Sequence, residues 1–150
     1  MKIEIADAAA MEALGAQLAQ ALTAGIIYLK GDLGAGKTTL ARGFLRALGY
    51  AGRVRSPTYT LIEPYPFDSW AVYHLDLYRL SDARELEDLG LRDLLSEQAL
   101  LLVEWPERGQ GVLPEPDLLV TIEHRGEGRR VTLEPASAAG ERLMSPLQAG

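Results

Sequence analysis

Apolar residues recur along the first third of the chain in patterns typical of helices and strands. Residues 8–22 place apolar side chains at helical spacing, and Asp7 is positioned to cap that helix. These side chains are Met11, Leu14, Leu18 and Leu22. Residues 26–29, rich in β-branched and aromatic side chains, predict a buried strand. Helical spacing returns over residues 39–48 and ends at Gly49, so we expect helix, strand, loop and helix in that order.

The middle of the chain changes to shorter, alternating segments. Residues 59–63 and 70–76 predict two strands, and residues 64–69, with two prolines, predict the turn between them. The two strands should therefore form an antiparallel hairpin. Two short helices are expected next, one ending at Gly90 and one over residues 91–96.

The last third of the chain predicts three strands and a tail. Residues 99–103 are a continuous apolar run, typical of a strand that is buried on both faces. Residues 117–123 and 129–133 predict two further strands, joined by the glycine-rich residues 126–128. Alanine, serine and glycine dominate residues 135–150, where we expect a poorly ordered tail.

Composition limits the class of protein. The chain has 150 residues, of which 47% are apolar, enough for the core of one domain. Its net charge of −6 argues against a protein whose main task is to grip nucleic acid. Because cysteine is absent, neither a disulfide-linked partner nor a thiolate metal site is possible. The N-terminus lacks the apolar core of a signal peptide, and no apolar run approaches the about 20 residues of a membrane span. We therefore expect a cytoplasmic protein without a membrane partner.

Residues 31–38, GDLGAGKT, fit the pattern G-x-x-x-x-G-K-[ST] of a phosphate-binding loop. The glycines let the backbone approach a ligand, and the loop amides with the helix N-terminus form an anion site. Lys37 can reach the β- and γ-phosphates of a nucleotide, and the Thr38 hydroxyl can bind Mg²⁺. We expect Lys37 to be exposed in the nucleotide-free protein. The expected phosphate contacts are Leu33, Gly34, Ala35, Gly36, Lys37, Thr38 and Thr39.

The order strand, glycine-rich loop, helix predicts a single α/β domain of the P-loop NTPase type over residues 1–134. Its central sheet should be mixed and flanked by helices. We expect parallel strands around residues 26–29 and 100–103, and antiparallel strands from the hairpin and the C-terminal pair.

A phosphate loop of this kind works with a second acid at the end of a buried strand. Glu104 directly follows the apolar run and is the candidate for binding Mg²⁺ together with Thr38, directly or through water. The alternative is a surface glutamate at a strand end. Asp76, at the end of the predicted hairpin, either acts in the site, by positioning the attacking water or holding a Mg²⁺-bound water, or caps the following turn. His74 would share a strand face with Asp76, but a histidine there is more often structural, and we assign it no role.

Several polar residues near the loop keep two interpretations. Ser56 and Thr58 are either switch hydroxyls that sense the γ-phosphate or ordinary turn residues. Arg79 is either an arginine that neutralises phosphate charge or a salt-bridge residue. A further group of arginines forms either a solvated face or a contact surface for RNA or an acidic partner. This group comprises Arg42, Arg46, Arg53 and Arg55.

Five sequence blocks occur in an order and spacing that resemble a known family. They are residues 31–39 (GDLGAGKTT), 56–60 (SPTYT), 74–79 (HLDLYR), 85–90 (ELEDLG) and 103–106 (VEWP). Over roughly residues 7–134 the chain resembles TsaE, the ATPase family of bacterial tRNA threonylcarbamoyladenosine biosynthesis. The phosphate loop alone is unspecific, but the later blocks together are highly specific.

The resemblance implies that the chain binds ATP and Mg²⁺ and hydrolyses ATP slowly when alone. It implies work with two partner proteins, TsaB and TsaD, and contact with tRNA indirectly through that complex. By motif, Lys37 contacts phosphate, Thr38 and Glu104 hold Mg²⁺, Asp76 supports hydrolysis, and Trp105 lies near the nucleotide. The family also suggests nucleotide contacts at Asp7 and Arg129, which lie outside its strong motifs.

Three alternative functions share the phosphate loop. A small-molecule kinase would usually carry an arginine-bearing lid, and no such segment stands out. A GTPase commonly selects guanine with N-K-x-D, which a chain without asparagine cannot form. A non-catalytic nucleotide-binding scaffold would not need a second acid such as Glu104 or Asp76.

Overall fold

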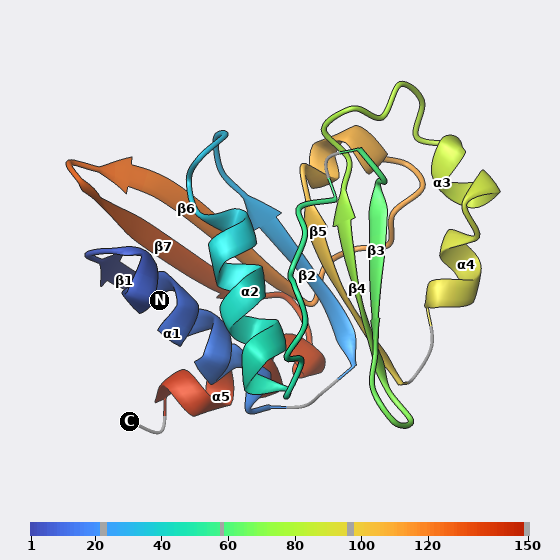
Figure 1. Cartoon of the computed structure of the whole chain (residues 1–150). Coiled ribbons are helices and arrows are strands. Elements are labelled where there is room, and N and C mark those ends of the chain that lie inside the picture. Colours follow the sequence, from blue (N-terminus) through green and yellow to red (C-terminus); the bar gives the residue numbers. More distant parts are fainter. Residues whose placement is uncertain (22–23, 58, 96–97, 149–150) are drawn as a thin grey trace.

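The computed structural model describes residues 1–21, 24–57, 59–95 and 98–148, which form one seven-stranded sheet with helices packed on it (Figure 1). The sheet order is β1-β7-β6-β2-β5-β4-β3. The strands are β1 (Lys2–Ile5), β2 (Gly25–Lys30), β3 (Ile62–Pro66), β4 (Ala71–Asp76), β5 (Ala99–Glu104), β6 (Leu118–Arg125) and β7 (Gly128–Pro135). The helices are α1 (Ala8–Ala19), α2 (Lys37–Ala47), α3 (Glu85–Asp88), α4 (Leu91–Leu94), the 3-10 helix η1 (Pro106–Gly109) and α5 (Ala138–Gln148).

The four inner strands, β6, β2, β5 and β4, run parallel, whereas β3, β7 and β1 pair antiparallel with their neighbours. The predicted α/β fold with a mixed sheet is therefore confirmed, including the antiparallel hairpin and C-terminal pair. All six residues of β5 are buried, which explains their continuous apolar run. The carboxyl ends of β2, β5 and β4 meet at one edge of the sheet, where open α/β sheets bind ligands.

Helices α1 and α2 lie side by side on one face of the sheet (Figure 1). Two glycines permit this close approach. A Cβ added at Gly15 would collide with the backbone of Leu40, and one added at Gly43 would collide with the backbone of Glu12. Glu12 also accepts a hydrogen bond from Arg42 across the same contact, at 3.3 Å. Helix α2, which directly follows the phosphate loop, is thus fixed against α1.

The opposite face of the sheet is covered by shorter elements, α3, α4 and the segment around η1. Leu86 and Leu91 from the two short helices are buried with Leu75, Leu77 and Leu101 in a second apolar cluster. This packing fixes the ends of β4 and β5 between two apolar layers, so the side chains at those ends are held in place.

Helix α5 occupies the segment that was expected to be a poorly ordered tail, so that expectation is wrong for residues 138–148. Leu143 and Met144 are buried in the same core as α1. The Ser137 hydroxyl donates to Asp117 at 2.6 Å and joins the start of the helix to the residue that precedes β6. The sequence concealed the helix because it begins with two alanines and a glycine and because Pro146 lies inside it.

Strand β1 was not predicted from the sequence. It has only four residues, and pairing with β7 at the edge of the sheet creates it. Strand β3 begins at Ile62 rather than at Tyr59, because residues 59 and 60 form a turn and Leu61 has a positive φ of 68°. The Leu61 carbonyl instead accepts a hydrogen bond from the amide of Asp76, at 2.9 Å.

Two helices end earlier than their sequence patterns indicated. Helix α1 ends at Ala19, and Leu22, the last of its predicted apolar positions, lies outside the described residues. Helix α4 ends at Leu94, and Ser96, its predicted last residue, also lies outside them.

Candidate nucleotide-binding site

The glycine-rich loop connects β2 to α2 at the carboxyl edge of the sheet. Gly34 and Gly36 adopt φ values of 78° and 118°, which side-chain-bearing residues rarely take. Gly36 is the N-cap of α2, and as a glycine it has no side chain to cap the first turn of that helix. The partial positive charge and the amides of the helix N-terminus therefore face the loop, as in an anion site.

Lys37 is only 5% exposed, so the expectation of an exposed lysine is wrong. Its ammonium nitrogen donates to the Gly31 carbonyl at 2.6 Å and lies 4.0 Å from the centre of the Trp105 ring. Burial lowers the pKa of the Lys37 ammonium, and the negative charges of Glu104 and Asp76 oppose that shift. The lysine is therefore folded against the loop and the aromatic ring, close to two carboxylates.

Glu104, the last residue of β5, is 3% exposed and faces the first turn of α2. The Thr38 hydroxyl donates to its Oε2 atom at 3.4 Å. Two oxygen donors this close fit Mg²⁺, which prefers oxygen ligands and usually takes only one or two from the protein. Among the described residues there is no cluster of three or more acidic or histidine side chains that could hold a metal alone. A metal here would have to complete its shell with phosphate oxygens and water.

Asp76 ends β4 and lies beside Glu104 in the sheet register. Burial raises the pKa of its carboxyl group, and the charge of Glu104 adds to the increase. The Tyr78 amide donates to its Oδ1 atom at 3.0 Å and opposes that shift. The carboxylate therefore accepts the turn amide, as the capping interpretation predicts, and also lies beside Glu104. Its action on water stays a prediction.

His74, to which the sequence analysis assigned no role, contacts the site. Its ring nitrogen Nε2 lies 2.5 Å from Oε2 of Glu104, and the side chain is fully buried. The available sequence signal was its spacing, two residues before Asp76, which puts both side chains on one face of β4. What the sequence could not indicate was that β5 is the neighbouring strand on that side.

Two adjoining cavities surround the loop. The larger, of about 260 Å³, is lined by Leu33, Gly34, Gly36, Lys37, Thr38, Thr39, Ser56, Asp76, Glu104 and Trp105. The smaller, of about 150 Å³, is lined by Ile5, Ala6, Asp7, Ala8, Met11, Gly34, Ala35, Gly36, Thr39, Glu127, Gly128 and Arg129. They share Gly34, Gly36 and Thr39, and each residue predicted to bind the nucleotide, the metal or the attacking water lines one of the two cavities.

Asp7 and Arg129 reach the loop from opposite ends of the sequence. Asp7 caps α1, accepting the Ala10 amide at 2.9 Å. The Arg129 guanidinium donates to the carbonyl oxygens of Ala35 and Gly34, at 3.0 and 3.3 Å. Arg129 therefore joins the β6–β7 hairpin to the phosphate loop.

Comparison with known proteins finds relatives that match most of this chain. The family model "Threonylcarbamoyl adenosine biosynthesis protein TsaE" matches residues 5–132. The chain belongs to the TsaE family. It is 48% identical over 120 residues to the tRNA threonylcarbamoyladenosine biosynthesis protein TsaE of Haemophilus influenzae, an alignment that covers 80% of this chain and 76% of that protein. The resemblance found in the sequence motifs is thus confirmed.

A second relative in sequence and a solved structure also match this chain. The TsaE of Bacillus subtilis is 42% identical over 105 residues, covering 70% of this chain and 65% of that one. The crystal structure of Bacillus subtilis YdiB superimposes with a TM-score of 0.81 at 30% identity, covering 99% and 94% of the two chains. The fold is therefore that of a solved structure over nearly the whole length.

The remaining polar candidates of this TsaE-family chain do not all line the two cavities. Ser56 lines the larger cavity, whereas Thr58 lies outside the described residues. Arg79 lies over the Tyr59 ring, 4.6 Å from its centre, and does not line either cavity.

Among the described residues, no helix is both long and apolar enough to cross a membrane.

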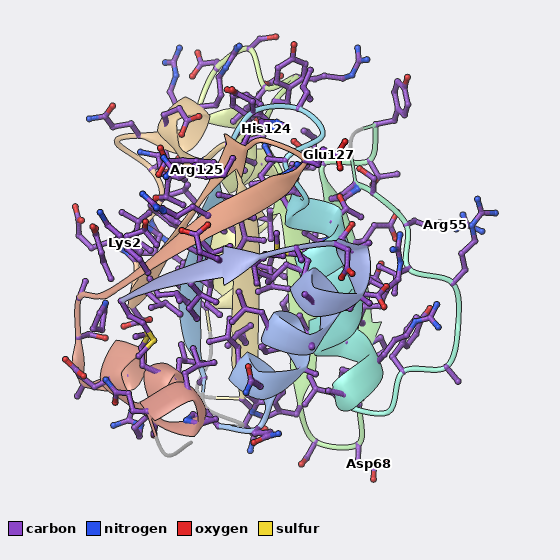
Figure 2. All side chains as sticks on the ribbon, turned by 90° about the vertical axis from the view of Figure 1, so that its left-hand side faces the viewer. Lys2, Arg55, Asp68, His124, Arg125 and Glu127 are labelled. Carbon is purple, nitrogen blue, oxygen red and sulfur yellow. The ribbon has the colours of Figure 1, made fainter. Side chains whose placement is uncertain are left out.

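The four arginines after the loop do not act as one cluster. Arg42 pairs with Glu12, and Arg46 is exposed in the last turn of α2. Arg53 and Arg55 border a separate hollow of about 300 Å³ on the loop before β3. Figure 2 shows the Arg55 side chain extending from this loop away from the rest of the molecule. Only the second pair is therefore placed to meet a partner beside Ser56.

Proposed function

We propose that this chain is a slow, Mg²⁺-dependent ATPase that supports threonylcarbamoyl modification of adenosine in tRNA together with the TsaB–TsaD complex. One observation carries the proposal: Lys37, Thr38, Asp76 and Glu104 come from three elements and line a single cavity. A protein that only bound nucleotide would need no buried acids beside its phosphate loop. The family's role in tRNA threonylcarbamoyladenosine biosynthesis supports the pathway.

In this proposal the phosphates of ATP occupy the larger cavity and its adenosine end the smaller one. The loop amides and the N-terminus of α2 bind the phosphate oxygens. Lys37 exchanges its hydrogen bond with the Gly31 carbonyl for contacts with the β- and γ-phosphates. Asp7 and Arg129 border the adenosine end, and Arg129 also holds the loop carbonyls in place.

Thr38 and Glu104 would hold Mg²⁺, with the nucleotide and water supplying the other ligands. When bound, the cation neutralises charge on the phosphate oxygens as the terminal bond breaks. The oxygen-only donor pair and its position beside the loop suit this ion better than a softer metal.

Asp76 would orient the attacking water. Its carboxylate is 5% exposed, and burial raises its pKa, so it accepts a proton more readily than an ordinary aspartate. The Tyr78 amide fixes the orientation of the carboxyl group. In this arrangement, Glu104 binds the metal and Asp76 acts on water, although the two acids are direct neighbours.

The proposed turnover is slow because, among the residues that the structure describes, no arginine lines the larger cavity, where the phosphates would lie. The Arg129 guanidinium donates hydrogen bonds to loop carbonyl oxygens, and the Arg79 guanidinium lies over the Tyr59 ring. An arginine supplied in cis or in trans can raise the rate on the order of 10³ to 10⁵-fold in related enzymes. A partner protein could therefore control hydrolysis by supplying the missing charge.

The proposed link to tRNA runs through proteins in the cytoplasm. A net charge of −6 disfavours a tight, direct grip on phosphate-rich RNA. Arg53 and Arg55 are exposed beside Ser56, which lines the larger cavity. A partner that contacts this loop could sense whether the γ-phosphate is present.

Phosphate release measured with ATP and GTP, with and without Mg²⁺, tests the enzymatic half of the proposal. We expect slow, Mg²⁺-dependent release from ATP. Reconstitution with purified TsaB and TsaD tests the other half, and we expect modified tRNA only when this chain and ATP are both present. Transfer of the phosphoryl group to a small-molecule acceptor instead of water would favour a kinase and overturn the proposal.

A further inference from the structure

The contact between His74 and Glu104 has no place in the mechanism described so far. Nε2 of His74 and Oε2 of Glu104 are 2.5 Å apart, and both side chains are buried, with 0% and 3% exposure. A buried polar pair at this distance is a hydrogen bond, and a carboxylate acceptor makes it a strong one. A contact of this kind restricts the rotation of both side chains.

The sheet register explains why these two residues meet. In β4 and β5, Asp76 lies opposite Glu104 and His74 lies opposite Leu102. His74 and Glu104 are therefore diagonal neighbours on one face of adjacent strands, within reach of long side chains. The imidazole approaches Glu104 from the strand side, whereas Thr38 approaches the same carboxylate from α2.

The hydrogen bonds of the His74 ring also indicate where its proton lies. Within the described part of the chain, Nδ1 of His74 is buried without a hydrogen-bond partner. A neutral imidazole carries one N–H, and the carboxylate of Glu104 can only accept. In the neutral ring, the tautomer that fits this contact therefore has its proton on Nε2 and none on Nδ1.

We propose that His74 is a positioning residue that holds the Glu104 carboxylate toward Thr38, in the orientation that binds the divalent cation. This inference rests on the proposed metal role of Thr38 and Glu104. Within the described residues, His74 and Thr38 both make their side-chain hydrogen bonds with Glu104 to the Oε2 atom. Partners that orient a metal-binding group typically contribute about 10- to 100-fold in metal affinity.

Three substitutions of His74 separate hydrogen bonding from packing. His74→Gln can place an N–H near the position of Nε2, whereas His74→Asn is too short to reach it, and His74→Leu fills space without a donor. His124, exposed on β6 near the β6–β7 turn, is the matched control for losing a histidine (Figure 2). Mn²⁺ serves as the probe, and its affinity for the ADP-bound protein is measured by electron paramagnetic resonance. The melting temperature of each variant is recorded without metal.

We expect His74→Leu and His74→Asn to lose about 10- to 100-fold in Mn²⁺ affinity, and His74→Gln and His124→Gln to stay near the parent. ADP affinity without metal should be unchanged in all four.

If His74→Leu binds Mn²⁺ as the parent does, the positioning role is overturned. If Gln and Asn lose affinity equally, in step with melting temperature, His74 is merely structural. If the parent binds no Mn²⁺, or Glu104→Gln binds it normally, the proposed metal site itself fails.

A second measurement needs no metal. Nitrogen-15 spectra of the two histidine rings, assigned with the His124→Gln variant, report which ring nitrogen carries the proton. We expect the His74 proton on Nε2, with a shift that changes in Glu104→Gln. A proton on Nδ1 would overturn the proposed hydrogen bond, whatever the metal affinities are.

Discussion

The ammonium group of Lys37 lies 4.0 Å from the centre of the Trp105 ring while it donates to the Gly31 carbonyl. In Lys37→Ala both contacts disappear together with the charge proposed to bind phosphate. We expect hydrolysis to fall on the order of 10²-fold or more, as when one stabilising donor is removed from other active sites. Trp105 fluorescence should also change, because the variant has no ammonium group over the indole ring.

Phosphate release and fluorescence spectra check this prediction. Lys30→Ala is the control, because Lys30 ends β2 next to the loop but is exposed and does not line the cavity. Hydrolysis by Lys37→Ala at the parental rate would show that the loop is not catalytic.

Asp76→Ala should separate chemistry from binding. If Asp76 orients water, the variant should lose at least about tenfold in the maximal rate, within the range of general acid–base effects, with little change in ATP affinity. Single-turnover kinetics and an equilibrium titration with ATP measure the two quantities. A loss of affinity that matches the loss of rate would instead identify a ground-state contact.

The raised pKa of Asp76 also predicts how stability depends on pH. The folded protein holds this proton more strongly than the unfolded chain, so stability is fully present below about pH 4 and declines as pH rises through the folded pKa. Asp76→Asn cannot ionise, so its stability relative to the parent should increase from pH 4 toward pH 7. Urea unfolding of both proteins at several pH values measures the difference. A constant difference would show that Asp76 is not perturbed.

Arg129→Ala should weaken nucleotide binding by releasing the loop. The side chain donates to two loop carbonyls, and losing hydrogen bonds from a charged group typically costs about 1.5 to 3 kcal/mol. We expect ATP affinity to fall about tenfold or more. Arg130→Ala is the control, because Arg130 is the next residue on β7 but pairs with Glu4 at 2.6 Å instead. Equal affinities in both variants would exclude the proposed role of Arg129.

Arg55→Glu should weaken ATP-dependent association with the TsaB–TsaD complex without abolishing ATP binding. The side chain extends away from the molecule, while its neighbour Ser56 lines the cavity (Figure 2). Titrations with ATP, with ADP and without nucleotide measure the association. Arg125→Glu, with the same charge change near the β6–β7 turn, is the control. If affinity is equal in all three nucleotide states, nucleotide does not control docking.

Leu143→Ala tests whether α5 belongs to the core. Leu143 is fully buried, and truncation of a buried leucine to alanine costs about 2 to 5 kcal/mol. We expect a corresponding decrease in the free energy of unfolding, measured by urea denaturation. Gln148→Ala, exposed in the same helix, should change it by less than about 0.5 kcal/mol. If both variants unfold alike, residues 138–148 contribute no packing.

The sequence by itself determined the features that depend on neighbouring residues. The strand, loop and helix around residues 31–38 follow from local backbone preferences, and Glu104 follows directly from the apolar strand before it. These two local features already predict a phosphate site with a second acid. The family resemblance added Trp105, which lies in one of its blocks, and Asp7 and Arg129, which lie outside them. No local pattern connects these three residues to the loop.

Only the tertiary structure decided which distant residues meet. Lys37 is buried because Trp105, far along the chain, lies over its ammonium group. His74 contacts Glu104 because β4 and β5 are neighbours, and strand order is not encoded in either strand's own pattern. Helix α5 forms on the core that the rest of the chain provides, since its own sequence offers few apolar positions and a proline. Local preferences act over a few residues, whereas these contacts depend on how the whole sheet is assembled.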